Sequence, residues 1–544
     1  MQINKFFEIL KKEFQGYSLS SLSKDVLAGI TCTAVALPLA LAFGVSSGAD
    51  AASGLICAII AGFVIGGLSG ASFQISGPTG AMAAILISLS SQYGLQGIFI
   101  AGFLSGLLLL LFAFLKVGKL VYFIPKPVIT GFTSGIAIII VLGQIDNAFG
   151  TYSEGSSALL KIGSYFSLGF HPVLSVVMYT LIAMLIMILW PKKLTKYFPS
   201  SLLAIIVCLA IQLIFSLDVP VVGSIPRTLL PAERLTLSTL ISTKLTAFIS
   251  PALSIALLGM IESLLCGASG AKMKGEKIDS TQELYAQGIG NIIIPFFGGI
   301  PATAAIARTS VAIKSGGVTR LVSIFHSIGL LLSMFILSPF MASIPLSALA
   351  GVLIITAWRM NEWKSIRLIF SHKIKTSIAQ FLVTMGATVV FDLTSAILIG
   401  VSLSMVLFVL HSVGDLHIEV DEAHIPKSPV PTRIAYIDGA LFFGTQDKIT
   451  QTVEKLRRDG IKRIILSLRG VNVIDHSEAE ELENVFSECK NNGIEIHICG
   501  LHKEAERIFN RLGMDFYKQH HHTSVVTCLE ALGLPGLESS ETLS

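Results

Sequence analysis

Asn291 to Lys314 reads NIIIPFFGGIPATAAIARTSVAIK, a hydrophobic run that breaks at Gly298, Gly299 and Pro301 and then resumes. The pattern predicts a helix that begins at Ala302, in the middle of a membrane, with first-turn N–H groups that have no intrahelical partner. Those N–H groups and the positive end of the helix dipole form an anion-binding site. In lipid, such irregular backbone persists only where it is buried in protein or lines a water-filled cavity. The break therefore indicates a binding site.

A second break of the same design lies at residues 76–81, SGPTGA, before another short apolar segment. Interrupted segments at corresponding positions of two halves indicate the binding site of an inverted-repeat transporter. Arg308, about two turns into the other segment, adds a full positive charge. The alternative is that each break marks only a kink or a loop between ordinary spans. The predicted anion-binding residues are Ser76, Pro78, Thr79, Gly80, Ala81, Pro301, Ala302, Thr303, Ala304 and Arg308.

The composition is that of an integral membrane protein. Of the 544 residues, 52% are hydrophobic and only 14% are charged, and the mean hydropathy is +0.75. The net charge of +4 is too small to indicate a nucleic-acid partner. The seven cysteines include no CxxC pair, so we expect neither a disulfide framework nor a zinc site.

The apolar segments predict an α-helical polytopic protein with about fourteen crossings or half-crossings between residues 25 and 412. Lysines and arginines gather in alternate short loops, which places those loops in the cytoplasm. An even number of spans then leaves both termini cytoplasmic, as expected for a multi-pass protein of the cytoplasmic membrane. Residues 1–24 lack the apolar core of a signal peptide and predict an amphipathic helix at the membrane surface.

A water-soluble domain follows the membrane segments. Residues 413–431 are polar and proline-bearing and predict a linker. Between residues 432 and 535, strand patterns alternate with helix patterns, which predicts a small α/β domain. His520, His521 and His522 are interpreted as a solvated run, and residues 536–544 as a disordered tail.

Several motifs resemble those of the SulP (sulfate permease) family of anion transporters with a C-terminal STAS domain. In the membrane part they are Ala36 to Gly44 (ALPLALAFG), Ser76 to Gly80 (SGPTG), Gly131 to Gly135 with Gln144, Gly288 to Asn291 (GIGN), Gly298 to Thr303 (GGIPAT) and Ala307 to Thr309 (ART). In the soluble part they are Ala440 to Gly444 (ALFFG) and Val473 to Ser477 (VIDHS).

The resemblance implies a seven-plus-seven inverted repeat of core and gate domains, a homodimer, and a substrate held between the ends of the third and tenth helices. The family moves sulfate, bicarbonate, chloride, oxalate or dicarboxylates by proton or sodium coupling or by exchange. The first motif is most similar to the bacterial branch that includes sodium-dependent bicarbonate transporters. Many other members carry Gln or Glu near Leu39, so this residue argues against a proton carrier at that position.

Glu262, in an apolar helix pattern, is the predicted residue of cation coupling. An ionisable group in a membrane costs at least ~2.5–3.5 kcal/mol unless it faces protein or water. Na⁺ would take oxygen ligands from Glu262 and from carbonyls near Gly299, whereas H⁺ needs the carboxylate alone. At the positions of Glu262 and Cys266, the bicarbonate branch that this chain resembles has Asp and Thr. A soft thiol is a poor ligand for Na⁺. The alternative is that Glu262 pairs with Arg308 and only stabilises the fold.

Two other functions fit the same sequence. One is uncoupled anion conduction through the same fold. The other is signalling or scaffolding with a cytosolic partner of the STAS domain, because Ser477 lies near a phosphoacceptor position of that pattern. We favour instead a Ser477 that caps the helix starting there. No catalytic constellation indicates an enzyme, and we expect no cofactor beyond the coupling cation.

Overall fold

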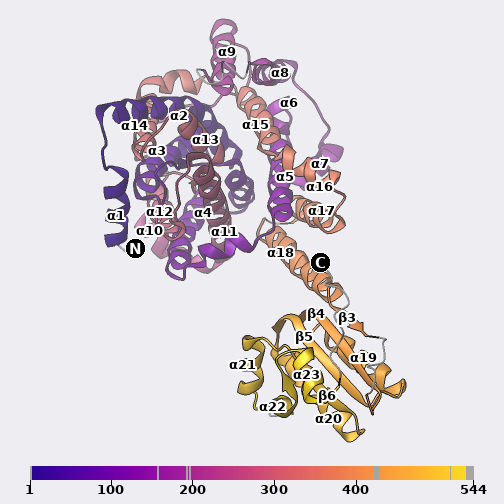
Figure 1. Cartoon of the computed structure of the whole chain (residues 1–544). Coiled ribbons are helices and arrows are strands. Elements are labelled where there is room, and N and C mark those ends of the chain that lie inside the picture. Colours follow the sequence, from indigo (N-terminus) through magenta and orange to yellow (C-terminus); the bar gives the residue numbers. More distant parts are fainter. Residues whose placement is uncertain are drawn as a thin grey trace. The chain divides into compact units, whose positions relative to one another are not determined.

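A computed structural model describes residues 3–155, 158–191, 194, 198–391, 393–421, 428–514 and 516–534. The chain forms two compact units, residues 1–402 and residues 403–544 (Figure 1). The predicted tail at 536–544 and residues 422–427 of the predicted linker lie outside the described residues.

The first unit is helical, and seven of its described helices, counted with α18 at its boundary, are long and apolar enough to cross a membrane. The predicted polytopic helical architecture is confirmed. Helix α4 contains one break, where Gly94 adopts a φ of 65°. The helices are α1 Ile3–Glu13, α2 Leu19–Ser46, α3 Ala51–Leu68, α4 Gly80–Phe114, α5 Lys126–Gly143, α6 Ile145–Phe149, α7 Ala158–Leu168, α8 Leu174–Leu189, α9 Ser200–Phe215, α10 Leu237–Ser242, α11 Ile249–Lys274, α12 Ser280–Ile293, α13 Ile306–Lys314, α14 Leu321–Ala342, α15 Leu346–Met360, α16 Trp363–Ser371, α17 Lys375–Val390 and α18 Leu393–Gly414.

These helices pack in two groups. Helices α2, α3, α4, α11, α12, α13 and α14 pack on one another, and α5, α8, α9, α15 and α17 form the second group (Figure 1). Small residues permit close packing: a Cβ on Gly54 of α3 would lie 2.1 Å from the carbonyl oxygen of Ala40 in α2. The division agrees with the core and gate domains that the family resemblance implies.

Two short strands cross at the centre of the first group. Strand β1, Ser76–Gly77, pairs antiparallel with β2, Thr303–Ala304. The predicted helix start at Ala302 is therefore wrong, because these residues are extended and α13 begins only at Ile306. Helix α4 begins three residues after β1, and α13 begins two residues after β2, so the pairing brings the two helix starts close to one another.

The N-terminal segment forms the predicted helix, α1, and packs on the first unit. Phe6 of α1 is buried, and Glu13 forms a 2.7 Å ion pair with the Nη2 atom of Arg320. Asp25 is fully buried and accepts hydrogen bonds from the backbone N–H groups of Val318 and Thr319. Both acidic groups therefore fix the connection that precedes α14.

The second unit is a five-stranded sheet with helices, as predicted. Its order is β3-β4-β5-β6-β7, with β3 antiparallel to β4 and the other neighbours parallel. Strand β3 lies within the stretch predicted as a linker, so residues 417–420 belong to the sheet. The elements are β3 His417–Val420, β4 Thr432–Leu441, α19 Gln446–Arg458, β5 Arg463–Ile474, α20 His476–Asn491, β6 Glu495–Cys499, α21 Lys503–Arg511, α22 Phe516–His520, β7 His521–His522 and α23 Val525–Ala531.

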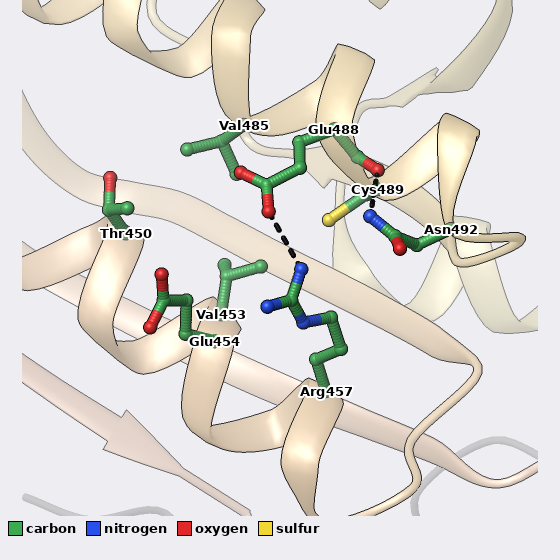
Figure 2. Close-up of a pocket in the computed structure, with 8 residues that line it drawn as sticks. All are labelled: Thr450, Val453, Glu454, Arg457, Val485, Glu488, Cys489 and Asn492. Carbon is green, nitrogen blue, oxygen red and sulfur yellow. Dashed lines mark hydrogen bonds and ion pairs between the residues drawn. The ribbon is translucent and has the colours of Figure 1, made fainter.

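Helices cover both faces of this sheet. Alternate strand residues such as Ile464 and Leu466 pack with α19 and α20, whereas Ile465 packs with α23. A hollow of about 10 Å³ lies between α19 and α20, where Arg457 and Glu488 form a 2.7 Å ion pair (Figure 2). A space of that size holds about one water molecule, so we do not place a ligand site there.

Candidate functional site

A cavity of about 770 Å³ lies between the two groups of helices in the first unit. One wall is formed by the starts of α4 and α13 together with the middle of α11, and the other by α5, α9 and α15. Of the predicted site residues, those on the cavity wall are Thr79, Gly80, Ala81, Glu262 and Arg308.

Helix α4 starts at this cavity with a capped first turn. The hydroxyl oxygen of Thr79 accepts a hydrogen bond from the N–H of Met82 at 3.3 Å, and Thr79 thus serves as the N-cap. The same hydroxyl donates to Glu262 Oε2 at 2.9 Å. The cap and the carboxylate are therefore one hydrogen-bonded unit.

Helix α13 starts opposite without a side-chain cap. Its N-cap residue is Ala305, which carries no hydrogen-bonding group, and the following residues, Ile306 and Ala307, line the cavity. The first-turn N–H groups of a helix have no intrahelical acceptor. They are thus available to an anion in the cavity.

Arg308 lies in this same first turn and is fully buried. Its Nη2 atom donates to the carbonyl oxygen of Pro78 at 2.6 Å, whereas its Nη1 atom has no hydrogen-bond partner. Within the described part of the chain, no carboxylate lies within 4.0 Å of the guanidinium. A cation at a helix N-terminus adds to the positive end of the dipole, which is unfavourable unless an anion is nearby. Among the described residues, the guanidinium therefore has no direct ion-pair partner.

The close approach of Arg308 depends on Gly77. This glycine has a φ of 156°, and a Cβ there would lie 2.6 Å from Arg308 Nη1. Any other residue would both strain the backbone and displace the guanidinium.

Polar side chains of α11 and α12 form hydrogen bonds with the paired strands β1 and β2. Asn291 accepts from the N–H of Ala302 at 2.8 Å and donates to its carbonyl at 3.0 Å. Ser263 accepts from the N–H of Ala304 at 3.2 Å, and Gln287 donates to Ser76 Oγ at 3.0 Å. The N–H groups expected to be free at Ala302 and Ala304 are therefore already bonded.

The predicted residues from the break itself lie behind the cavity wall. Pro301 packs on Gly102, and Thr303 is fully buried, with its hydroxyl 3.0 Å from that of Ser263. Gly299 packs against Cys57. These residues shape the crossing, and the start of α13 replaces them at the cavity surface.

The residues predicted to bind the coupling cation do not all lie at one place. Glu262 lines the cavity, but the thiol of Cys266, one turn later, points to Thr309 Oγ1 at 3.3 Å, and Gly299 is absent from the wall. The alternative that Glu262 pairs with Arg308 finds no ion pair between these two described residues. Thr79 supplies the hydroxyl next to Glu262 that Cys266 does not.

Sequence reasoning missed other cavity residues. Arg359 lines the wall and donates to the carbonyl oxygen of Met187 and to Ser200 Oγ. Phe43 and Phe132 also line it. The sequence signal for Arg359, a cation at the end of an apolar segment, resembles that of any topology-determining basic loop.

Two further charged residues, Glu283 and Asp475, have structural roles. Glu283 is fully buried and accepts from Ser69 Oγ at 2.5 Å and from the N–H of Gly70 at 3.1 Å. In the soluble unit, the predicted cap role of Ser477 is wrong, because α20 begins at His476 and Asp475 is its N-cap. Asp475 accepts from the N–H of Glu478 at 2.8 Å.

Two family models match the chain. The model of the sulfate permease family matches residues 22–406, and the model of the STAS domain matches residues 425–526. YvdB of Bacillus subtilis, described as a putative sulfate transporter, is 34% identical over 529 residues, covering 93% of this chain and 98% of the relative. The bicarbonate transporter BicA of Synechocystis is 28% identical over 521 residues, covering 90% of each chain.

Solved structures share the fold. The transmembrane domain of a cyanobacterial bicarbonate transporter, BicA, matches with a TM-score of 0.64 and 28% identity, covering 71% of this chain and 98% of that one. The structure of SLC26A9 matches with a TM-score of 0.81 and 16% identity, covering 98% of this chain and 94% of that one. The second likeness concerns the fold alone, and it includes the sheet-containing C-terminal unit.

Proposed function

This chain belongs to the sulfate permease family, and we propose that it is a secondary active transporter of a small inorganic anion of the sulfate or bicarbonate class. The observation that carries the proposal is the uncapped start of α13, where Arg308 adds its charge to the helix dipole without an ion pair. An anion between the starts of α4 and α13 would neutralise both.

The proposed anion-binding site consists of the first-turn N–H groups of Gly80 and Ala81 in α4 and of Ile306 and Ala307 in α13. Arg308 raises the positive potential behind them. The cavity is far larger than a small anion, so the substrate would enter with part of its hydration shell. Movement of the first helix group against the second would then carry the anion across.

Coupling is proposed to run through Glu262, by H⁺ or by Na⁺. The carboxylate already accepts from Thr79, whose side chain also caps α4. A cation at Glu262 would therefore act on the same helix start that holds the anion, which gives a direct route for coupling. Thr79 Oγ1 provides one hard oxygen for Na⁺, whereas H⁺ requires only the carboxylate.

The family resemblance supports three accompanying proposals. The protein lies in the cytoplasmic membrane with both termini in the cytoplasm, it forms a homodimer, and it needs no cofactor besides the coupling cation. A regulatory role of the STAS domain with a cytosolic partner is a secondary proposal.

The test is uptake of labelled bicarbonate and of labelled sulfate into proteoliposomes, each under an imposed Na⁺ gradient and under an imposed H⁺ gradient. We expect one cation gradient to drive accumulation of at least one anion above its equilibrium level. An ionic current far above transporter turnover, with no accumulation, would support an uncoupled channel instead. No movement of either anion would contradict the proposed substrate class.

A further inference from the structure

We infer that the soluble unit holds a Zn²⁺-class metal ion, bound by His497 of β6, His522 of β7 and Cys528 of α23. One ligand atom of each residue lies within 4.8 Å of the ligand atoms of the other two. His497 and Cys528 are buried and His522 is half-buried. Imidazole nitrogens with a thiolate form a ligand set that Zn²⁺ prefers.

The sheet register brings these residues to one face. His497 and Cys499 are two residues apart on β6 and so share a face, and His522 pairs with Cys499 across to β7. Cys528 packs against the same face from α23, in one cluster with Cys499. The expectation of a solvated histidine run is therefore wrong for His522, which joins the sheet edge.

The two histidine rings already have the separation that a metal needs. His497 Nδ1 lies 3.2 Å from His522 Nε2. Two nitrogens bound tetrahedrally to Zn²⁺ at 2.0–2.1 Å would be about 3.3 Å apart. The cysteine thiols would have to move closer, because a sulfur ligand would lie about 3.6 Å from each nitrogen.

A carboxylate orients the first ligand. His497 Nε2 lies 2.9 Å from Glu495 Oε1, and the other oxygen of Glu495 pairs with Arg463 Nε at 2.6 Å. With its proton on Nε2, His497 turns the lone pair of Nδ1 toward His522. Metal-bound histidines ordinarily donate the second ring N–H to a carboxylate, a backbone carbonyl or a water molecule, and Glu495 is such a partner here.

Cys499, on the same face of β6 as His497, would supply the fourth ligand once its thiol moves toward the two ring nitrogens. Its thiol hydrogen-bonds that of Cys528 and is fully buried. A metal replaces this thiol pair with two thiolates and releases their protons to solvent. The complete Cys₂His₂ set would then tie β6, β7 and α23 together at the end of the described chain.

The experiment uses the purified full chain in detergent with a reducing agent. Zinc content is measured by mass spectrometry, Zn²⁺ affinity by competition with a chromogenic chelator, and the ligand set by the spectrum of the Co²⁺-substituted protein. We expect one tightly held Zn²⁺ per chain and a Co²⁺ spectrum with a thiolate charge-transfer band and tetrahedral intensity.

His522→Ala and Cys528→Ser should each lower Zn²⁺ affinity by roughly 100-fold or more, and Cys528→Ser should weaken the charge-transfer band. Glu495→Gln keeps all ligands and should lower the affinity by about tenfold. The matched controls are His521→Ala, on the opposite face of β7, and Cys489→Ser, a buried thiol outside the cluster; neither should change the affinity.

Wild-type protein that binds no Zn²⁺ would overturn the inference. It would also fall if the control variants lost as much affinity as the ligand variants. Because Glu495→Gln leaves the ligands in place, its effect keeps the inference testable even if His522→Ala fails to fold.

Discussion

The two helix starts that face the cavity are built from opposite chemistry. At α4, Thr79 caps the first turn and holds the carboxylate of Glu262. At α13, Ala305 provides no cap, and the first turn contains the buried cation Arg308. One start thus has a side-chain cap that also bonds a carboxylate, whereas the other has no side-chain cap and, among the described residues, no carboxylate within 4.0 Å of its arginine. From this difference we propose that the anion binds chiefly at α13 and the coupling cation chiefly at α4.

The largest effect is expected when the charge at α13 is removed. Arg308→Ala should raise the apparent KM for anion uptake by roughly 10- to 100-fold, because a charge-assisted hydrogen bond contributes about 1.5–3 kcal/mol. Arg308→Lys should recover part of the loss, since it keeps the charge but not the planar fork. Uptake kinetics in proteoliposomes measure both.

Arg367→Ala is the matched control, because it removes the same charge from an exposed site outside the cavity. It should leave the KM unchanged. An Arg308→Ala protein that is well folded and has wild-type KM would remove Arg308 from the site.

The next effect concerns the carboxylate at α4. Glu262→Gln keeps the size and removes the charge, so cation-driven accumulation should be lost while downhill anion movement persists. Glu362→Gln, which changes another carboxylate on the cavity wall, should retain accumulation. Accumulation ratios with and without the cation gradient give the comparison. A Glu262→Gln protein that still concentrates the anion would refute the coupling role.

A smaller effect is expected at the cap. Thr79→Ala removes the α4 cap, which costs about 1 kcal/mol, and leaves Glu262 without its hydroxyl donor. Thr79→Ser restores both interactions. We expect the apparent affinity for the coupling cation to fall severalfold in Thr79→Ala and to return in Thr79→Ser. Equal behaviour of the two variants would show that the hydroxyl is not part of the cation site.

The smallest effect should come from making the two starts alike. Ala305→Ser introduces a cap at α13, which should stabilise the helix by up to about 1 kcal/mol. The new hydroxyl would compete with the anion for the first-turn N–H groups, so anion affinity should fall by a few-fold. Thermal unfolding and uptake KM are measured on the same sample. Tighter anion binding by the Ala305→Ser protein would contradict the proposal that the uncapped N–H groups of α13 bind the anion.

The sequence predicted the helical membrane unit, the α/β unit and the two breaks, because apolar periodicity and Gly-Pro interruptions are local signals. It placed the start of α13 four residues too early. The extended conformation of Thr303 and Ala304 depends on pairing with residues more than 200 positions away and on Asn291, and neither is visible in a local pattern.

In the soluble unit, too, local patterns predict an element well, and contacts between distant residues escape them. The strongly amphipathic pattern of residues 446–458 by itself predicts a helix, and α19 has these bounds. The cap of α20 was misassigned because Asp475 and Ser477 are both good cap residues and the end of β5 decides between them. Strand β7 has two residues, too few for a sequence pattern, so the contact of His522 with His497 could not be predicted.

The proposed transport mechanism depends on anion binding at the uncapped start of α13. It is tested most directly by equilibrium binding of radiolabelled sulfate and bicarbonate to the purified protein, without any gradient, in wild type, Arg308→Ala and Arg367→Ala. We predict that the protein binds at least one of the anions, that Arg308→Ala weakens this binding by roughly tenfold or more, and that Arg367→Ala leaves it unchanged. Equal affinity in all three proteins would contradict this mechanism.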